Sequence, residues 1–253
     1  MTNISYECYA LGESAIVVQL GTRIDPTIHE QIRQLAAYIE ANSFPGYREM
    51  VTAYTTITIY YDSFAVYTDQ ANTGSHTGLL PYERVLSYIQ ATIREFEQKD
   101  MTVFHEPHRV VEIPVCYGGL YGPDLEEVAF YHGISAEEVI HRHTSQVYPV
   151  YMIGFAPGFP YLGGMDERIA TPRKKVPRER IPAGSVGIGG SQTGIYSLET
   201  PGGWNLIGRT PLALFQPKAS NPTLLNVGDR VRFVPITGEQ YDQQAERDEL
   251  NEL

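Results

Sequence analysis

The chain has 253 residues, of which 42% are hydrophobic and 19% charged, and its formal net charge is -11. These totals predict a soluble globular protein of one large or two ordinary domains, and they disfavour binding to nucleic acid, which depends on clustered Lys and Arg. No apolar run reaches the ~18 residues that span a bilayer, and no basic segment followed by an apolar one opens the chain, so we expect neither a membrane segment nor a secretion signal. Two cysteines, Cys8 and Cys116, are too few for a disulfide framework and are expected to be reduced thiols of a cytoplasmic protein.

Residues 1–104 are expected to form a small α+β domain. A β-rich run at 14–20 precedes Asp25-Pro26, which offers a helix cap and a proline at the first helical position. Residues 51–61 alternate β-branched and aromatic side chains and predict one long strand. Two predicted helices each carry an apolar face, formed by Ile28, Ile32, Leu35, Ala36 and Ile39 in the first and by Tyr82, Val85, Ile89, Ile93 and Phe96 in the second.

Residues 105–236 are expected to form a second, mainly β domain, followed by an acidic tail at 237–253 that is either a frayed helix or unstructured. The domain begins with a strand at 109–116 and two short helices, which open with capping signals at Asp124 and Ser135. Two short helices around a glycine also suggest a helix-turn-helix DNA reader. The second of them is acidic where such a reader would contact bases, which argues against DNA binding.

The stretch 151–211 predicts the functional site. More than half of the 23 glycines lie there, together with Trp204, the only tryptophan. Glycine serves where the backbone must take a positive φ or pass close to another group, and proline serves where φ must be fixed. Short apolar bursts between these turn signals indicate a compact β-structure with large loops rather than a disordered linker.

Within this stretch, the glycine-rich loop GIGGSQTG at 187–194 resembles a phosphate-binding loop. Gly189 and Gly194 have the GxxxxG spacing, but Ile195 and Tyr196 stand where that motif needs a lysine and a hydroxyl residue, so it is not a nucleotide motif. Two interpretations stay open. The loop presents backbone N–H groups and polar side chains to a small ligand, or it is a tight turn of a barrel.

A basic run interrupts the acidic chain at 168–180. Its six cations are separated by prolines that hold the segment extended. The run is either a solvated charged surface or an anion site for a carboxylate or phosphate, for which guanidinium groups are suited. The cations are Arg168, Arg173, Lys174, Lys175, Arg178 and Arg180, and the aromatic residues that could wall such a site are Phe155, Phe159, Tyr161 and Trp204.

The histidines and cysteines carry weaker signals. No CxxC or HExxH spacing occurs, so we predict no metal site. His143 lies at the end of a predicted helix, where it acts either as a general acid or base or as a cation favoured by the helix dipole. A Cys116–His143 nucleophile pair is the alternative to a buried, inert thiol at Cys116.

Three long motifs in this chain resemble one family. They are GFAPGFPYLGG at 154–164, PAGSVGIGGSQTGIY at 182–196 and PGGWNLIGRTPLALF at 201–215, and the likeness covers nearly the whole chain. The family comprises the 5-oxoprolinase B subunits, the Kip-type inhibitors of a sporulation histidine kinase, and subunit 1 of the allophanate hydrolase and urea carboxylase group. Membership alone does not separate these functions.

The resemblance implies a small N-terminal α/β domain, a C-terminal cyclophilin-like β-barrel, and a role as the B subunit of a hetero-oligomeric 5-oxoprolinase. That enzyme cleaves 5-oxo-L-proline to L-glutamate with ATP as co-substrate, and the chain would act with an A subunit and with a carboxylase-like C subunit. The rival function is an inhibitor that binds a sporulation sensor histidine kinase and blocks its autophosphorylation. Proline isomerase activity, suggested only by the barrel, is disfavoured because no cyclophilin catalytic motif occurs.

A cationic, glycine-lined cleft suits the chemistry of that enzyme. A lactam is a poor electrophile, and phosphorylation of its oxygen would create a leaving group whose charge needs fixed donors. We expect Arg173 and Lys174 to supply charge, residues 189–193 to supply hydrogen bonds and His143 to move a proton. The predicted catalytic residues are therefore His143 and Arg173, and the predicted substrate-binding residues are Phe155, Pro157, Gly158, Lys174, Gly189, Gly190, Gln192, Thr193, Trp204 and Arg209.

Overall fold

The structure is a computed structural model, and it describes residues 4–69, 78–99 and 109–251. The chain divides into two compact units, Met1–Pro107 and His108–Leu253. The boundary expected from the sequence, between residues 104 and 105, lies outside the described residues. Each unit has its own core of buried apolar side chains.

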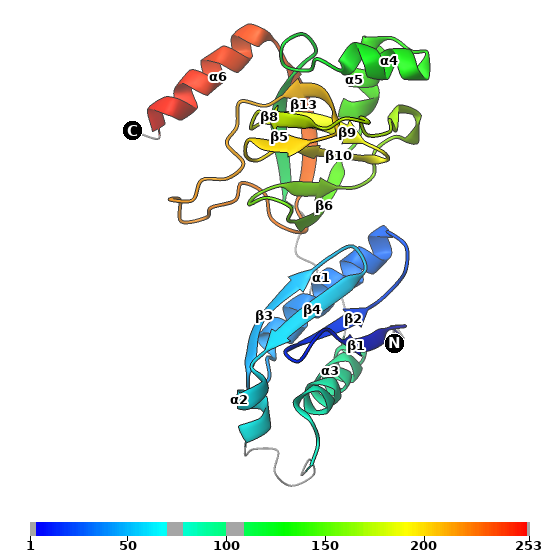
Figure 1. Ribbon diagram of the computed structural model, residues 1–253, viewed down its shortest axis with the longest axis vertical. Helices are drawn as coiled ribbons and strands as arrows, with labels where there is room; N and C mark the ends of the chain where they lie inside the picture. Colours follow the sequence, from blue (N-terminus) through cyan, green and yellow to red (C-terminus); the bar gives the residue numbers. More distant parts are fainter. Residues whose placement is uncertain (1–3, 70–77, 100–108, 252–253) are drawn as a thin grey trace. The chain divides into compact units, whose positions relative to one another are not determined.

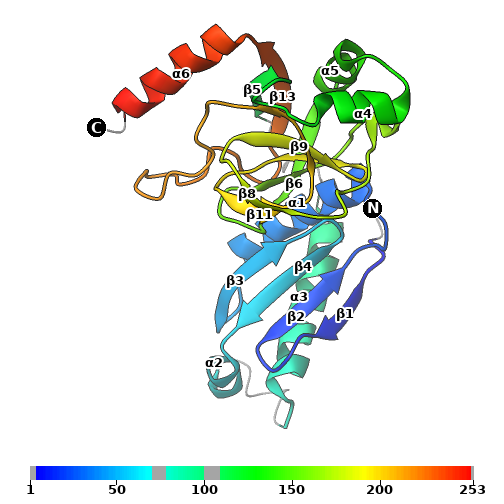
Figure 2. The ribbon, with the colours of Figure 1, turned by 45° about the horizontal axis from the view of Figure 1, so that its top comes forward.

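The first unit is a four-stranded antiparallel sheet with α1 and α3 on one face (Figure 2). Alternate residues of its central strands, such as Ile16, Val18, Ile57 and Ile59, are fully buried and share one core with the apolar faces of these helices. The strand order is β1-β2-β4-β3. The elements are β1 (Glu7–Ala10), β2 (Ala15–Gln19), α1 (Pro26–Ala41), β3 (Tyr47–Thr52), β4 (Thr56–Tyr61), α2 (Ser63–Thr68) and α3 (Pro81–Glu97).

The sequence signals of this unit are right for α1 and α3, do not include α2, and are wrong for one strand. The Asp25 carboxylate accepts hydrogen bonds from the first turn of α1, at 2.7 Å from the Thr27 N–H, so the predicted cap is confirmed. The single strand predicted over 51–61 is instead the β3–β4 hairpin, closed by the Ala53 N–H on the Thr56 carbonyl at 2.8 Å. No Gly, Pro, Asn or Asp marks this turn, and the alternating side chains therefore conceal it.

The second unit is built on a closed barrel of seven strands in the order β10-β7-β6-β13-β5-β12-β9. Figure 1 labels β5, β6, β9, β10 and β13 of this barrel. β13 pairs in parallel with β5 and antiparallel with β6, and the remaining barrel pairings are antiparallel. β8 and β11 form a separate two-stranded sheet. The strands are β5 (Val110–Tyr117), β6 (Tyr148–Ile153), β7 (Pro160–Leu162), β8 (Arg178–Ile181), β9 (Ser185–Gly189), β10 (Gln192–Ile195), β11 (Thr200–Gly202), β12 (Asn205–Arg209) and β13 (Arg230–Ile236).

Two short helices, α4 (Leu125–His132) and α5 (Ala136–Thr144), lie together on the barrel unit, and the 3-10 turn η3 (Glu167–Ile169) contacts both (Figure 1). Gly133 ends α4 in the left-handed conformation, at φ 64°. The Ser135 hydroxyl accepts the Glu138 N–H at 3.2 Å and caps α5, as predicted. The predicted cap at Asp124 is wrong, because its carboxylate bonds to β12 and to the basic run instead of the first turn of α4.

A helix, α6 (Gly238–Asn251), forms where the sequence predicted either a frayed helix or an unstructured tail. Tyr241 of this helix packs against Tyr121 with the ring centroids 4.5 Å apart, and the Tyr121 hydroxyl donates to Asp242 at 3.2 Å. Both views show α6 apart from α4 and α5 (Figures 1 and 2). Of the helices within the described ranges, α6 included, none combines the length and apolar character needed to cross a membrane.

Candidate functional site

A pocket of about 180 Å³ lies on the barrel unit and is walled by aromatic side chains. The Phe159 ring makes edge-to-face contacts with four neighbouring rings, at centroid distances from 5.2 to 5.9 Å. Such contacts stabilise and orient the rings, and Phe159, Tyr196 and Trp204 are almost fully buried, so the wall is preformed. The pocket is lined by Phe155, Phe159, Tyr161, Arg173, Tyr196, Pro201, Gly202, Gly203 and Trp204.

Trp204 packs against glycines of β9 and β10, which explains why glycine is so frequent here. A Cβ atom on Gly189 would lie 2.5 Å from the indole Nε1, and one on Gly194 would lie 3.1 Å from Cζ3. A Cβ atom on Gly187 would lie 3.2 Å from the Cβ of Trp204. The indole reaches this position because these residues carry no side chain.

Arg173 is the cation of the basic run that belongs to the pocket. Its guanidinium carbon lies 5.8 Å from the centroid of the Trp204 ring, within the range of cation–π attraction. Within the described ranges Arg173 makes no ion pair, so its charge is available to an added anion. Four other cations of the run pair with carboxylates: Arg168 with Asp166, Lys174 with Asp124 and Glu127, Arg178 with Asp124, and Arg180 with Glu199.

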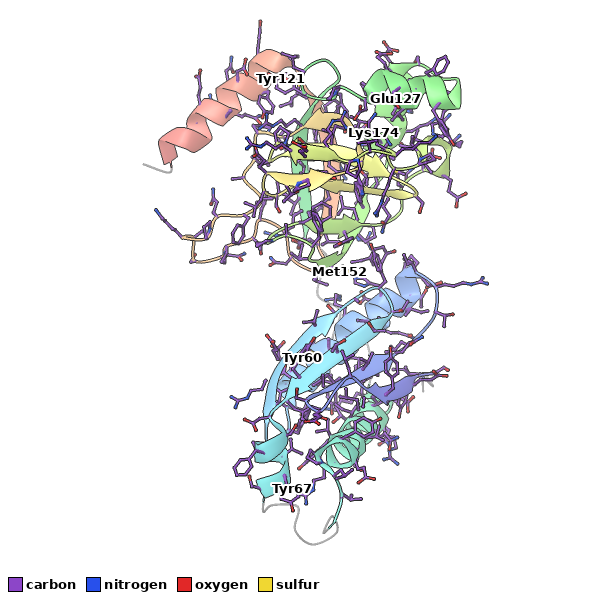
Figure 3. The ribbon with its side chains drawn as sticks, viewed as in Figure 1. Tyr60, Tyr67, Tyr121, Glu127, Met152 and Lys174 are labelled. Carbon is purple, nitrogen blue, oxygen red and sulfur yellow. The ribbon has the colours of Figure 1, made fainter. Side chains whose placement is uncertain are left out.

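Lys174 is not among the residues that line the pocket. Its ammonium nitrogen lies 2.9 Å from Asp124 Oδ1 and 2.6 Å from Glu127 Oε2, and Figure 3 labels Lys174 and Glu127 side by side. Desolvation opposes the charged form, but the hydrogen bonds to both carboxylates raise the pKa of Lys174 above its ordinary value. Its charge is therefore engaged within the fold, and its contact with a substrate stays a prediction.

The glycine-rich loop forms the β9–β10 hairpin, which is the tight turn that the sequence left open as one interpretation. Gln192 pairs with Gly189, so Gly190 and Ser191 make a two-residue connection, and Gly190 takes a positive φ of 67°. The Gly190 N–H already donates to the Thr171 carbonyl at 2.8 Å. The loop does not line the pocket, and its hydrogen bonding to a ligand stays a prediction.

His143 is completely buried and joins α5 to two barrel strands. Its Nδ1 lies 2.8 Å from the Tyr117 hydroxyl, and its Nε2 lies 2.9 Å from the Thr193 hydroxyl. The Thr193 hydroxyl donates its single proton to the Gly187 carbonyl at 3.0 Å, so Nε2 carries the imidazole hydrogen and Nδ1 accepts from Tyr117. Burial lowers the pKa of His143 to about 3, and the ring is neutral. Neither His143 nor Thr193 lines the pocket, and their predicted contacts with substrate are untested.

Cys116 and His143 do not face each other. Tyr117 bonds to His143, and successive residues of a strand point to opposite sides, so Cys116 points away from the imidazole. Burial raises the pKa of the Cys116 thiol, which favours the inert form. Within the described part of the chain, no group of three or more His, Cys, Asp or Glu side chains is arranged to hold a metal ion.

Phe155 is held at the pocket by a strained backbone. Its φ is 67°, which is uncommon for a residue other than glycine, and the Ala156 N–H donates to the Gly154 carbonyl at 2.8 Å to close a γ-turn of the rare, strained kind. Two more hydrogen bonds fix the loop, from Phe159 N–H to the Ala156 carbonyl and from Gly154 N–H to the Phe159 carbonyl. Phe155 is 66% exposed, so the loop presents a preorganised aromatic surface.

The pocket brings together three residues predicted to be catalytic or to bind substrate, Phe155, Arg173 and Trp204, with two further residues predicted to wall the site, Phe159 and Tyr161. Pro157 and Gly158 belong to the loop that carries Phe155 but do not line the pocket. Arg209 also lies outside it, and its Nε donates to the Ala183 carbonyl at 2.9 Å. Tyr196 and residues 201–203 line the pocket without having been predicted, although the family motifs quoted from the sequence contain them.

Similarity to known proteins covers both units. A family model described as "Carboxyltransferase domain, subdomain C and D" matches residues 6–225, a range that includes every pocket residue. The B subunit of 5-oxoprolinase from Bacillus subtilis (strain 168) is 48% identical over 238 residues, which are 94% of this chain and 96% of that protein.

Solved structures share the fold. The protein TTHA0988 is 35% identical with a TM-score of 0.71, over 88% of this chain and 40% of its own, so this chain spans less than half of that protein. The K. lactis urea amidolyase is 20% identical with a TM-score of 0.69, over 97% of this chain and 16% of its own, and its likeness concerns the fold alone. The resemblance seen in the sequence motifs is confirmed: the chain belongs to the carboxyltransferase-domain family, subdomains C and D, together with the B subunits of 5-oxoprolinase.

Proposed function

We propose that this chain is the B subunit of an ATP-dependent 5-oxoprolinase and that its aromatic pocket binds 5-oxo-L-proline. Similarity to the B subunit of a known 5-oxoprolinase, over nearly the whole length of both chains, supports the enzyme. The assignment of the pocket rests on one observation. The guanidinium of Arg173, which makes no ion pair among the described residues, lies over Trp204 in a pocket of aromatic walls.

The pocket suits the chemical groups of this substrate. 5-Oxo-L-proline is a small five-membered lactam ring with one carboxylate, and a guanidinium can bind a carboxylate through two parallel hydrogen bonds. The aromatic walls suit the apolar edge of the ring. Tyr196 offers a third contact, because burial raises its pKa and the Trp204 backbone donates to its hydroxyl. The hydroxyl proton of Tyr196 can then be donated to the lactam oxygen.

In this proposal the chain binds 5-oxo-L-proline and does not itself bind ATP. The lactam oxygen takes the terminal phosphoryl group of ATP and releases ADP. Water then adds to the activated carbon, and the ring C–N bond breaks to give γ-glutamyl phosphate. A second water hydrolyses this acyl phosphate to L-glutamate and phosphate. The chain carries no nucleotide motif, and the A and C subunits are the proposed partners. Support for action beside other domains comes from TTHA0988, in which the stretch similar to this chain is 40% of a longer protein.

A binding titration tests the pocket directly. Trp204 is the only tryptophan, so its emission reports on the pocket of the purified full-length chain. We expect a saturable change on addition of 5-oxo-L-proline and a much weaker response to L-proline, which lacks the lactam oxygen. Arg173→Ala should weaken binding by at least about 10-fold, as expected for a lost charge-assisted hydrogen bond. The affinity of Arg173→Lys for 5-oxo-L-proline should lie between those of the unmodified chain and Arg173→Ala. A flat titration for the unmodified chain would refute the assignment of the pocket.

A reconstitution assay tests the enzyme. Glutamate release from 5-oxo-L-proline and ATP is measured in an extract that lacks this chain but contains the other subunits. Adding the purified chain should restore ATP-dependent release, and adding the Arg173→Ala variant should not. Without restoration the enzyme proposal fails, and the rival function is then tested by measuring autophosphorylation of a sporulation sensor histidine kinase with and without the chain.

A further inference from the structure

Asp124 is a buried carboxylate outside the pocket that the proposed chemistry does not use. Its residue is 4% exposed, immediately before α4. One oxygen accepts the backbone N–H of Leu206 at 2.7 Å, and the other accepts Arg178 at 2.7 Å and Lys174 at 2.9 Å. Burial alone would raise the pKa of Asp124, but these hydrogen bonds lower it below its ordinary value, so the group is charged at neutral pH. A buried charge with all of its partners in place fixes their positions.

The two cations that Asp124 binds lie on either end of one short segment, residues 174–178, and Arg173 directly precedes it. We call residues 172–178 the strap. The strap is also fastened through its backbone, because the Asn205 side chain donates to the Pro172 carbonyl at 2.9 Å. The Lys174 N–H donates to the carbonyl of Gly203, a pocket residue, at 2.7 Å. The Arg173 backbone is thus held on both sides, while its guanidinium lies over Trp204.

Asp124 connects the strap to the strand that follows Trp204. Its carboxylate and its backbone N–H both bond to Leu206, the latter to the Leu206 carbonyl at 2.9 Å. The same carboxylate therefore sets the distance between the segment that carries the guanidinium and the segment that carries the indole. Glu127 also binds Lys174, but its side chain is 65% exposed and makes no such connection to β12.

We propose that Asp124 is a positioning residue for the pocket, which fastens the strap to β12 and so places the Arg173 guanidinium over Trp204, where it can bind a carboxylate. The identity of that carboxylate as 5-oxo-L-proline rests on the proposed function. The positioning itself rests on the bonds among Asp124, Lys174 and Arg178.

Asp124 could act on the pocket through its charge or through the position that it gives to Arg173. These two explanations predict opposite changes in carboxylate affinity when Asp124 is neutralised. If Asp124 acted by its charge alone, Asp124→Asn would leave Arg178 without its carboxylate partner and Lys174 with Glu127 alone, and the added positive charge near the pocket would tighten carboxylate binding. If Asp124 acts by position, the strap loosens, Arg173 leaves the indole and carboxylate binding weakens. The sign of the change in affinity therefore distinguishes the two explanations.

The experiment uses the full-length chain, with Asp124→Asn as the variant and Glu127→Gln as the matched control, since both remove a carboxylate partner of Lys174. Trp204 emission is titrated with 5-oxo-L-proline, and its quenching by neutral acrylamide is measured without ligand. We expect Asp124→Asn to weaken binding at least about 10-fold. Acrylamide quenching should rise at least about twofold as the strap uncovers the indole. Glu127→Gln should match the unmodified chain in both measurements.

Unchanged or tighter binding in Asp124→Asn, or unchanged quenching, would overturn the proposal. If Asp124→Asn does not fold, as judged by circular dichroism, Lys174→Met removes one of the two strap contacts and should shift quenching in the same direction by a smaller factor. If Trp204 emission of the unmodified chain does not change on addition of 5-oxo-L-proline, the proposed ligand is refuted. Acrylamide quenching, which needs no ligand, would still decide whether Asp124 positions the strap.

Discussion

Replacing Gly189 by alanine tests whether the glycines of this region act through the packing of Trp204. The added Cβ would lie 2.5 Å from the indole Nε1 and 2.6 Å from Cδ1 and Cε2, whereas ordinary contacts begin near 3.4 Å. The indole must therefore move by about 1 Å, against the rings of Phe159 and Tyr196. Overpacking of this kind costs about 1–3 kcal/mol. In a domain of this size, that lowers the melting temperature by roughly 3–10 °C.

The matched control is Gly154→Ala. Neither glycine has a positive φ, and a Cβ on Gly154 would meet only the Met152 Cε at 3.5 Å and the Tyr161 ring at 3.7 Å, which are ordinary contacts. Thermal unfolding and the Trp204 emission spectrum are measured for both variants. Gly189→Ala should melt lower and shift the emission, and Gly154→Ala should stay within about 0.5 kcal/mol of the unmodified chain. Equal melting temperatures with unchanged emission would refute the packing argument.

Two further predictions concern buried His143 and strained Phe155. Burial depresses the pKa of His143 from 6.5 to about 3, so the unfolded chain binds that proton more readily. The neutral His143 side chain makes its full contribution to the free energy of unfolding above pH 6.5. This contribution falls by about 1 kcal/mol per pH unit as the pH drops from 6.5 towards 3. Denaturant unfolding at pH 7 and pH 5 should therefore show a smaller decrease for His143→Gln than for the unmodified chain, and equal decreases would contradict this origin. Phe155→Gly relieves the positive φ while Phe155→Ala retains it, so the glycine variant should be more stable by about 1 kcal/mol. Both should lose affinity for 5-oxo-L-proline, and equal stability would show that the γ-turn stores no strain.

Local sequence signals predicted the elements that depend on neighbouring residues. Asp25 and Pro26 start α1, Gly133 ends α4 and Ser135 caps α5, because each acts on its own turn of backbone. The β3–β4 hairpin was missed because its turn uses residues with no strong conformational preference, so tertiary pairing alone defines it.

The site could be located from the sequence, but its internal contacts could not. The stretch 151–211 contains every residue that lines the pocket, and the basic run contributes Arg173 to it. The partners of two of the cations are distant in the sequence, however, because Lys174 and Arg178 bind Asp124, about 50 residues away. The sequence analysis assigned the charge role to Arg173 and Lys174, whereas the fold pairs Lys174 and three other cations of the run with carboxylates and leaves Arg173 at the aromatic wall. His143 lies in the last turn of α5, as the sequence predicted, but its complete burial depends on the packing of α5 and is not visible in the local sequence.

The position of β13 constrains how the protein is made. It is the last barrel strand in the sequence but lies between β5, the first, and β6. During synthesis, β5 and β6 therefore leave the ribosome well before the strand that joins them, and the barrel cannot close until residues 230–236 have emerged. All strands of the first unit lie within residues 7–61, so that unit can be completed earlier. A nascent chain stalled before β13 would expose two unpaired strand edges, which other chains can pair with, and would need chaperone protection at that stage.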